Sequence, residues 1–334
     1  METPPPETHA RSPVIALVFN RAGRLRGGWR FLVFVCAFVL VSAGGFKIYS
    51  TVVRFAPELR ELTRGRAGFV TPSLISLLAA TLVGWASLRA LEDLPTRALG
   101  WAFHPRWPRD LLIGALVGGA SLCAALLPGV LAGGTRFFPS GEPAAAIADT
   151  LAVSALIFLL GAAGEEALFR GYPLQTLLRS WPAWLALVPT AVLFAAVHLD
   201  NPNVVRGFTF LNTVLAGVWL AVAYLRTRSL WFPLGVHFGW NWTMGALLGV
   251  PVSGITQLTP APVLRAVDTG PAWLTGGHYG VEGGVACTLA LLLSTLFIWR
   301  TRLVAADPEL ARLVTRENPS AGADVAAGEA GNKD

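Results

Sequence analysis

The sequence has few charged residues. Only 14% of its 334 residues are Asp, Glu, Lys or Arg, whereas a soluble domain carries about 25%. So small a charged fraction cannot cover a water-facing surface, and this excludes a soluble globular enzyme. The net charge of +6 comes without any basic stripe interleaved with aromatic residues on a polar segment. We therefore expect no nucleic-acid partner.

Cysteine is also scarce. Cys36, Cys123 and Cys287 each lie inside an apolar run. Three is an odd number and no CxxC spacing occurs, so neither a disulfide framework nor a cysteine zinc site is supported. We interpret all three as small packing residues.

The sequence is instead rich in long apolar runs. Several exceed 18 residues, the length that a helix needs to cross the hydrocarbon core of a bilayer. We predict an all-α, polytopic transmembrane helix bundle of about eight spans. They are expected near residues 30–50, 69–88, 110–132, 150–179, 183–200, 206–225, 231–250 and 281–299.

The distribution of polar residues divides the chain into five segments. These are a disordered, basic N-terminal segment (1–28), N-terminal transmembrane helices (29–140), a helical core (141–250), a loop with the last transmembrane helix (251–302) and a disordered tail (303–334). A short helix is expected near Asp307–Arg316. Gly114 and Gly118 have the spacing that lets two helix backbones approach closely. The distribution of Lys and Arg among the loops favours the cell membrane with both termini cytoplasmic.

Ionisable side chains inside a span cost about 2.5–3.5 kcal/mol each on insertion scales. In the predicted spans we find such groups, with one polar amide, at three places. They are Glu165, Glu166 and Arg170 in one span, His198 in the next, and His237 with Asn241 in a third.

The spacing in the first of these spans separates its two carboxylates. Glu166 and Arg170 are four residues apart, share a helix face and are expected to form an ion pair. Glu165 is rotated by about 100° from Glu166. A carboxylate left without that partner is suited to act as a general base near neutral pH.

The polar groups also have compatible depths. Glu165 lies 16 residues before Trp181 in the turn between two spans, and His198 lies 17 residues after it. In an antiparallel hairpin these positions have nearly the same height. A single His could instead bond to a backbone carbonyl, and Asn241 could join helices. These alternatives explain Glu165 together with His198 and His237 poorly, so we predict one intramembrane pocket.

Three stretches also resemble a known family. GEEALFRGYPLQTLLR, FAAVHLDNPN and SLWFPLGVHFGWN are similar to the signature segments EExxxR, FxxxH and HxxxN/D of the CAAX-processing-protease and bacteriocin-processing (CPBP, or Abi) intramembrane proteases. All three occur in order within residues 161–241, and the resemblance covers roughly a third of the chain. It implies an all-helical membrane endopeptidase, a CAAX-protease-like core at 141–250, and a cavity open to the bilayer. Eukaryotic members cleave prenylated C-terminal CAAX proteins.

The resemblance also implies a role for each matching residue. Glu165 would activate the attacking water, and His198 would help to hold it. Neutral His237 and the amide of Asn241 would stabilise the tetrahedral oxyanion, since both are donors that need no metal.

The same resemblance gives Glu166 and Arg170 a supporting role, and no cofactor is expected. The alternative is a zinc enzyme with Glu165, His198 and His237 as ligands, because two histidines and a carboxylate form a catalytic zinc set. The HExxH pattern that commonly places such ligands on one helix is absent.

The predicted function is an intramembrane endopeptidase that hydrolyses peptide bonds by glutamate-activated water. Its partners would be the lipid bilayer and a hydrophobic or membrane-associated protein, which could carry a C-terminal lipid. One alternative is a non-catalytic membrane scaffold or immunity factor with the same fold. Another is a transporter or channel, because intramembrane Glu and His also mark proton relays.

Overall fold

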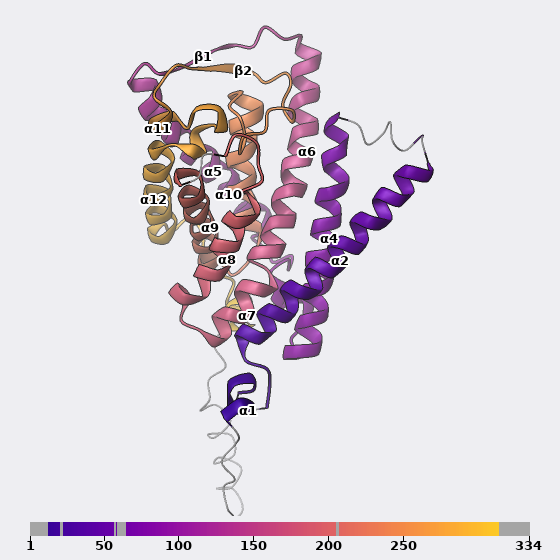
Figure 1. Ribbon diagram of the computed structural model, residues 1–334. Coiled ribbons are helices and arrows are strands. Elements are labelled where there is room, and N and C mark those ends of the chain that lie inside the picture. The colour runs from indigo at the N-terminus through magenta and orange to yellow at the C-terminus, as the bar shows by residue number, and fades with distance from the viewer. Residues whose placement is uncertain (1–12, 21–22, 57, 59–64, 205–206, 314–334) are drawn as a thin grey trace, which may run out of the picture.

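The protein is a bundle of helices with a small two-stranded sheet at one end (Figure 1). The computed structural model describes residues 13–20, 23–56, 58, 65–204 and 207–313. Within these residues the predicted all-α membrane bundle is confirmed. The tails expected to be disordered at 1–12 and 314–334 lie outside the described residues.

The elements follow one another mainly as helices. The longer helices are α2 (Gly27–Phe55), α4 (Val70–Glu92), α5 (Trp107–Leu131), α6 (Ala144–Phe169) and α9 (Phe208–Thr227). The shorter ones are α1 (Pro13–Val18), α7 (Tyr172–Ser180), α8 (Ala183–Val197), α10 (Trp231–Trp242), α11 (Ala272–Thr275), α12 (Val285–Arg300) and α13 (Pro308–Leu313). Single turns are η1 (Gly65–Phe69), η2 (Thr96–Leu99), the π-turn η3 (Thr243–Leu247), η4 (Gly277–Tyr279) and η5 (Val281–Gly283), and the strands are β1 (Thr135–Pro139) and β2 (Leu264–Asp268).

Five helical segments among the described residues are long and apolar enough to span a bilayer. They are α2, α4, α5, α6 taken together with α7, and α9. Each of the eight predicted spans contains a helix, but α8, α10 and α12 are shorter than the predicted spans. These have 15, 12 and 16 residues. Hydropathy counts the apolar residues of neighbouring turns as helix, and so it overestimated their length.

The predicted span 150–179 is broken into two helices. Helix α6 ends where the N–H of Gly171 bonds to the carbonyl oxygen of Glu166 at 2.9 Å. Pro173 then lies in the first turn of α7, where the missing N–H of a proline costs nothing. Glu165 is therefore one turn from the end of α6, where the chain leaves the helix axis.

Helices α5 and α10 touch through their backbones. A Cβ atom added to Gly118 would lie 2.0 Å from the carbonyl oxygen of Val236, and one added to Gly239 would lie 2.1 Å from that of Ala115. Only glycine permits this separation, so the close approach predicted at Gly118 is confirmed. The contact fixes the depth of α10, and with it the position of His237.

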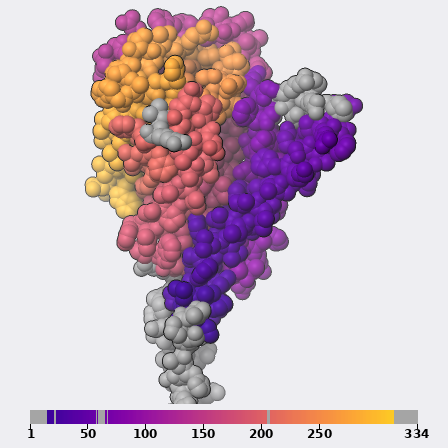
Figure 2. Space-filling model, in the orientation of Figure 1, coloured from indigo at the N-terminus to yellow at the C-terminus, as the bar shows by residue number. Residues whose placement is uncertain are grey.

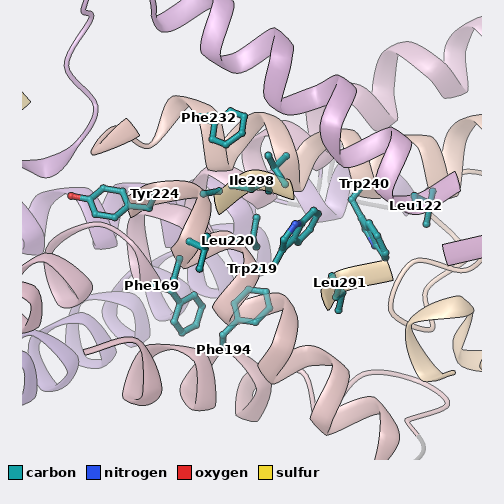
Figure 3. Packing of buried hydrophobic residues seen from close by; sticks show 14 of the residues in the cluster. Leu122, Phe169, Phe194, Trp219, Leu220, Tyr224, Phe232, Trp240, Leu291 and Ile298 are labelled. Carbon is teal, nitrogen blue, oxygen red and sulfur yellow. The ribbon is translucent and has the colours of Figure 1, made fainter. Parts of the chain in front are cut away.

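Aromatic side chains fill the centre of the bundle (Figure 3). Trp219 on α9 and Trp240 on α10 meet edge to face with ring centroids 5.5 Å apart. The indole N–H of Trp219 donates to the hydroxyl of Ser294 at 2.8 Å, so its polar atom is satisfied within an apolar region. This packing holds α9, α10 and α12 together around the interior face of α10.

Helix α2 lies on the outside of the bundle. Figure 2 shows it as the indigo band that crosses one face of the molecule diagonally. It packs against α4 and α7, while apolar side chains such as Leu40, which is 73% exposed, point away from the protein. An apolar surface of this kind suits a helix that faces lipid.

The sheet was not predicted. Strands β1 and β2 pair antiparallel, with Thr135 opposite Asp268 and Pro139 opposite Leu264, above the ends of α5 and α10 (Figure 1). Segment 251–302 was expected to hold only a loop and a helix, and its strand is a correction. Five-residue strands in connecting loops are too short to show a clear alternation of apolar and polar residues.

Both terminal segments are more ordered than expected. Helix α1 falls within segment 1–28, and α13 falls within 303–334, close to the short helix that the sequence predicted. Leu310 of α13 is buried at 2% exposure, and Glu309 pairs with Arg97 at 2.6 Å. The expectation of disorder is thus wrong for these described parts, because α13 has an apolar residue to bury.

Candidate active site

The four predicted catalytic side chains line one cavity inside the bundle. The cavity has a volume of about 270 Å³. Glu165 comes from the last turns of α6, His198 from the residue that ends α8, and His237 and Asn241 from successive turns of α10. Three helices therefore bring together the groups that the sequence placed at matching depths.

The carboxylate of Glu165 faces both imidazoles. Its Oε2 atom lies 3.9 Å from Nε2 of His198 and 3.8 Å from Nε2 of His237. These separations are too long for direct hydrogen bonds, and Oε2 has no hydrogen-bond partner among the described residues. A water molecule placed between the three atoms would satisfy them together. The geometry is therefore suited to holding one water against a carboxylate.

His198 is oriented by its own helix. Its Nδ1 atom donates to the carbonyl oxygen of Phe194 at 2.6 Å, and its ring packs against that of Phe194 with centroids 4.7 Å apart. A neutral ring protonated at Nδ1 has a lone pair at Nε2. His198 therefore presents a hydrogen-bond acceptor to the space beside Glu165.

Glu166 lies behind the cavity and is fully buried. Its Oε1 atom accepts hydrogen bonds from Nη1 of Arg170 at 3.2 Å and from Nδ1 of His237 at 2.9 Å. Arg170 also donates to the carbonyl oxygen of Gly217 at 3.1 Å and stacks 4.5 Å above the ring of Phe194. The predicted ion pair between Glu166 and Arg170 is confirmed, and it also positions His237.

The contact with Glu166 changes what His237 can do. A carboxylate paired with Arg170 can only accept hydrogen bonds, so Nδ1 of His237 must be the donor. A neutral ring would then present a lone pair at Nε2, and only the imidazolium form donates from that atom. The expectation that neutral His237 donates to an oxyanion is corrected, since donation from Nε2 requires the charged ring that Glu166 is placed to stabilise.

Asn241 lies one helical turn beyond His237 and lines the same cavity. Helix α10 widens into the π-turn η3 directly after it. Such wide turns frequently occur at functional sites. Its amide can donate a hydrogen bond without any change in protonation, which complements the imidazole of His237.

The zinc alternative would need Glu165, His198 and His237 to converge as ligands. Among the residues that the structure describes, no group of three or more His, Cys, Asp or Glu side chains is arranged to hold a metal ion. Imidazole nitrogens such as Nε2 of His198 and Nε2 of His237 are ligands that zinc prefers. Together with Glu165, however, they are not arranged to hold a metal ion.

Further polar residues line the cavity, among them three that are joined by hydrogen bonds and were missed in the sequence. Glu282, Ser253 and Asn212 line it from η5, from the loop after η3 and from α9. They lie outside the three motifs. For Glu282 a signal existed, because it lies within the predicted span 281–299. An acidic residue there has the same free-energy cost of membrane insertion as the ionisable residues identified in the other spans.

The comparisons with known proteins agree with this geometry. Residues 147–243 match the family described as type II CAAX prenyl endopeptidase Rce1-like. An "Uncharacterized 24.3 kDa protein" of Escherichia coli is 34% identical over 106 residues. That match covers 31% of this chain and 46% of the relative, so it spans less than half the length of the curated protein. No solved structure matches the chain.

The matched residues include α6, α8, α9 and α10, which are the helices that carry the four cavity residues and enclose them. The match also contains all three motifs on which the resemblance rested. Over residues 147–243 the chain is therefore similar to the Rce1-like CAAX endopeptidases, and this match supports the family predicted from EExxxR, FxxxH and HxxxN.

Proposed function

We propose that the protein is an intramembrane endopeptidase that hydrolyses peptide bonds of a hydrophobic or membrane-associated protein. One observation carries the proposal. Oε2 of Glu165 lies within 4 Å of two imidazole nitrogens, in a cavity inside a membrane bundle. A carboxylate and two imidazoles around a water-sized space provide the parts that peptide hydrolysis needs. The family match supports the same reaction class.

In the proposed mechanism Glu165 is the general base. It removes a proton from a water molecule that the lone pair of His198 helps to orient, and the hydroxide attacks the carbonyl carbon of the scissile bond. The same carboxyl group then returns the proton to the leaving amine, so that one residue serves both proton transfers. Glu165 has the freedom to do so, because no Lys or Arg in the described part of the chain pairs with it as Arg170 pairs with Glu166.

The oxyanion that forms is stabilised by donors aimed at it. We assign this role to the amide of Asn241 and to Nε2 of the His237 imidazolium. Glu166 stabilises the positive charge of that ring through Nδ1, and Arg170 holds Glu166 in place. A charged ring next to the oxyanion acts strongly in a cavity of low dielectric constant.

The proposal includes the cell membrane as the site of action, with both termini in the cytoplasm. The five spanning segments support a membrane protein, and the distribution of Lys and Arg favours this orientation. Cysteines introduced singly near each end and labelled with an impermeant maleimide would test it. Labelling of intact cells at either end would contradict the orientation.

The deciding experiment uses protein purified in detergent. Wild type and Glu165→Gln are compared on hydrophobic peptides offered with and without a C-terminal prenyl group, and the metal content of each preparation is measured. We expect Glu165→Gln to lower kcat/KM by at least about 10²-fold, the typical contribution of a general base. Glu309→Gln is the matched control, because it removes an equivalent carboxylate that is exposed and far along the chain.

Each alternative has its own result. Full activity of Glu165→Gln would contradict the glutamate mechanism. Stoichiometric zinc together with loss of activity on chelation would favour a metalloprotease. Cellular function that survives Glu165→Gln unchanged would favour a scaffold or immunity factor. Cleavage of only the prenylated peptide would define the substrate as lipidated, whereas equal cleavage of both would show that the lipid is not required.

A further inference from the structure

The catalytic cavity contains a second carboxylate that the proposed mechanism does not use. Glu282 lies in η5, just before α12, and lines the same cavity as Glu165. Its backbone is fixed by Asn212 on α9, whose amide donates to the carbonyl oxygens of Glu282 and Gly284 at 2.8 and 2.9 Å. The backbone that carries this carboxylate is thus fixed to α9 beside the site.

The side chain of Glu282 is held equally firmly. Oε1 accepts from the indole N–H of Trp240 at 3.1 Å, and Oε2 accepts from the backbone N–H and the hydroxyl of Ser253 at 2.7 and 2.9 Å. All three donors are neutral. A carboxylate can accept about four hydrogen bonds, so these three donors leave Glu282 without a cationic partner among them and with room for one further donor.

Among the described residues that line the cavity, the basic groups near that carboxylate are imidazoles, and His198 is close enough to interact with it. The ionisable groups among these described lining residues are Glu165, Glu282, His198, His237 and Cys287, with no Lys or Arg. Of the two acids, Glu165 faces the imidazoles, whereas Glu282 forms no ion pair with a Lys or Arg within the described part of the chain. A partly buried anion in this setting attracts a cation and repels a second anion.

We propose that Glu282 is a specificity-determining residue that selects peptides with a basic side chain next to the scissile bond and disfavours a free carboxylate there. This inference rests on the proposed function, because it concerns the substrate of the same cavity. The ammonium of Lys or the guanidinium of Arg would take the free acceptor position of Glu282.

The test uses acetylated and amidated peptides of leucine and alanine, so that neither end carries a charge. One position at a time, on either side of the cleaved bond, is Lys, norleucine or Glu. We expect wild type to prefer Lys over Glu at one position by about tenfold or more in kcat/KM, which corresponds to about 1.4 kcal/mol. In Glu282→Gln this ratio should fall to near one.

Two variants separate charge from structure. Glu282→Asp keeps the charge and should keep the preference for Lys. Ser253→Ala removes the hydroxyl hydrogen bond to the same carboxylate and leaves the charge, so it should also keep the preference. The inference is overturned if wild type shows no such preference, if Glu282→Gln retains it, or if Ser253→Ala abolishes it to the same extent.

Binding separates this inference from the proposed function. Fluorescent forms of the Lys and Glu peptides are titrated into Glu165→Gln, and into Glu165→Gln combined with Glu282→Gln. Tighter binding of the Lys peptide that depends on Glu282, without cleavage by wild type, would support the inference and contradict the proteolytic function. Cleavage by wild type with equal binding of both peptides would support the proteolytic function and contradict the inference.

Discussion

Replacing Glu166 with Gln tests the buried charge network directly. The structure predicts a large loss of stability, because Arg170 is 1% exposed and Glu166 is the one acidic partner within 4 Å that the described residues offer it. Removal of one partner from a buried ion pair costs about 3–5 kcal/mol. Gln still offers an amide oxygen, and Arg170 keeps its bond to the carbonyl of Gly217, so we expect the lower end, about 3 kcal/mol. This is about a hundredfold change in the unfolding equilibrium.

The assay is equilibrium unfolding in mixed micelles of dodecylmaltoside and SDS. It compares wild type, Glu166→Gln, Arg170→Met and the double variant. The double variant removes both charges and keeps most of the side-chain volume, so we expect it to be more stable than Glu166→Gln alone. Proteolytic activity should not return with the stability, since Nδ1 of His237 would then face an amide instead of a carboxylate.

Three results would contradict parts of this reasoning. Wild-type stability of Glu166→Gln would show that Arg170 does not depend on the carboxylate. A double variant less stable than Glu166→Gln would show that Arg170 contributes mainly by stacking over Phe194, at 4.5 Å, and not through its charge. Activity of the stable double variant equal to wild type would remove Glu166 from the proposed catalytic arrangement.

The remaining predictions concern packing, the oxyanion and the surface. Gly118→Ala should destabilise the protein by about 1–3 kcal/mol and lower activity, because its Cβ would lie 2.0 Å from a backbone oxygen of α10; Gly44→Ala, with open space around it, should do neither. Asn241→Ala should lower kcat by about 10²–10³-fold with little change in KM, as loss of an oxyanion donor does. Arg97→Met should change stability by no more than about 1 kcal/mol, because its pair with Glu309 is more than half exposed. The first and third are measured by unfolding in micelles, and the second by steady-state kinetics.

Each of these three predictions also has an outcome that would contradict it. Equal stability of the Gly118 and Gly44 variants would contradict the backbone contact between α5 and α10. A rise in KM with unchanged kcat for Asn241→Ala would make it a substrate-binding residue instead of an oxyanion donor. A loss well above 1 kcal/mol for Arg97→Met would show that α13 is held mainly by its ion pair and not by burial of Leu310.

Much of the candidate site could be predicted from spacing. The four-residue interval between Glu166 and Arg170 was enough to predict their ion pair, because helix geometry alone places them together. The matching distances of Glu165 and His198 from Trp181 predicted their common depth. That prediction held although the chain between Glu165 and Trp181 is not one helix, since α7 folds back against the bundle between them.

The failures have a common physical cause. The chain breaks between α6 and α7 near Gly171 and Pro173. The apolar residues on either side keep the hydropathy high there, so the break was not predicted. Strands β1 and β2 were missed because their pairing partners are more than a hundred residues apart. Glu282 was missed because its importance comes from donors on Trp240 and Ser253, which lie in other parts of the chain.

The amino-acid sequence by itself determined that this chain is a membrane bundle and which polar side chains lie within it, since the length of apolar runs and the helical repeat are local properties. Tertiary structure decided what those side chains do. It set Nδ1 of His237 against Glu166, turned both Nε2 atoms toward Glu165, and brought Glu282 into the same cavity. Such contacts depend on the relative rotation and tilt of separate helices, and no local pattern specifies these.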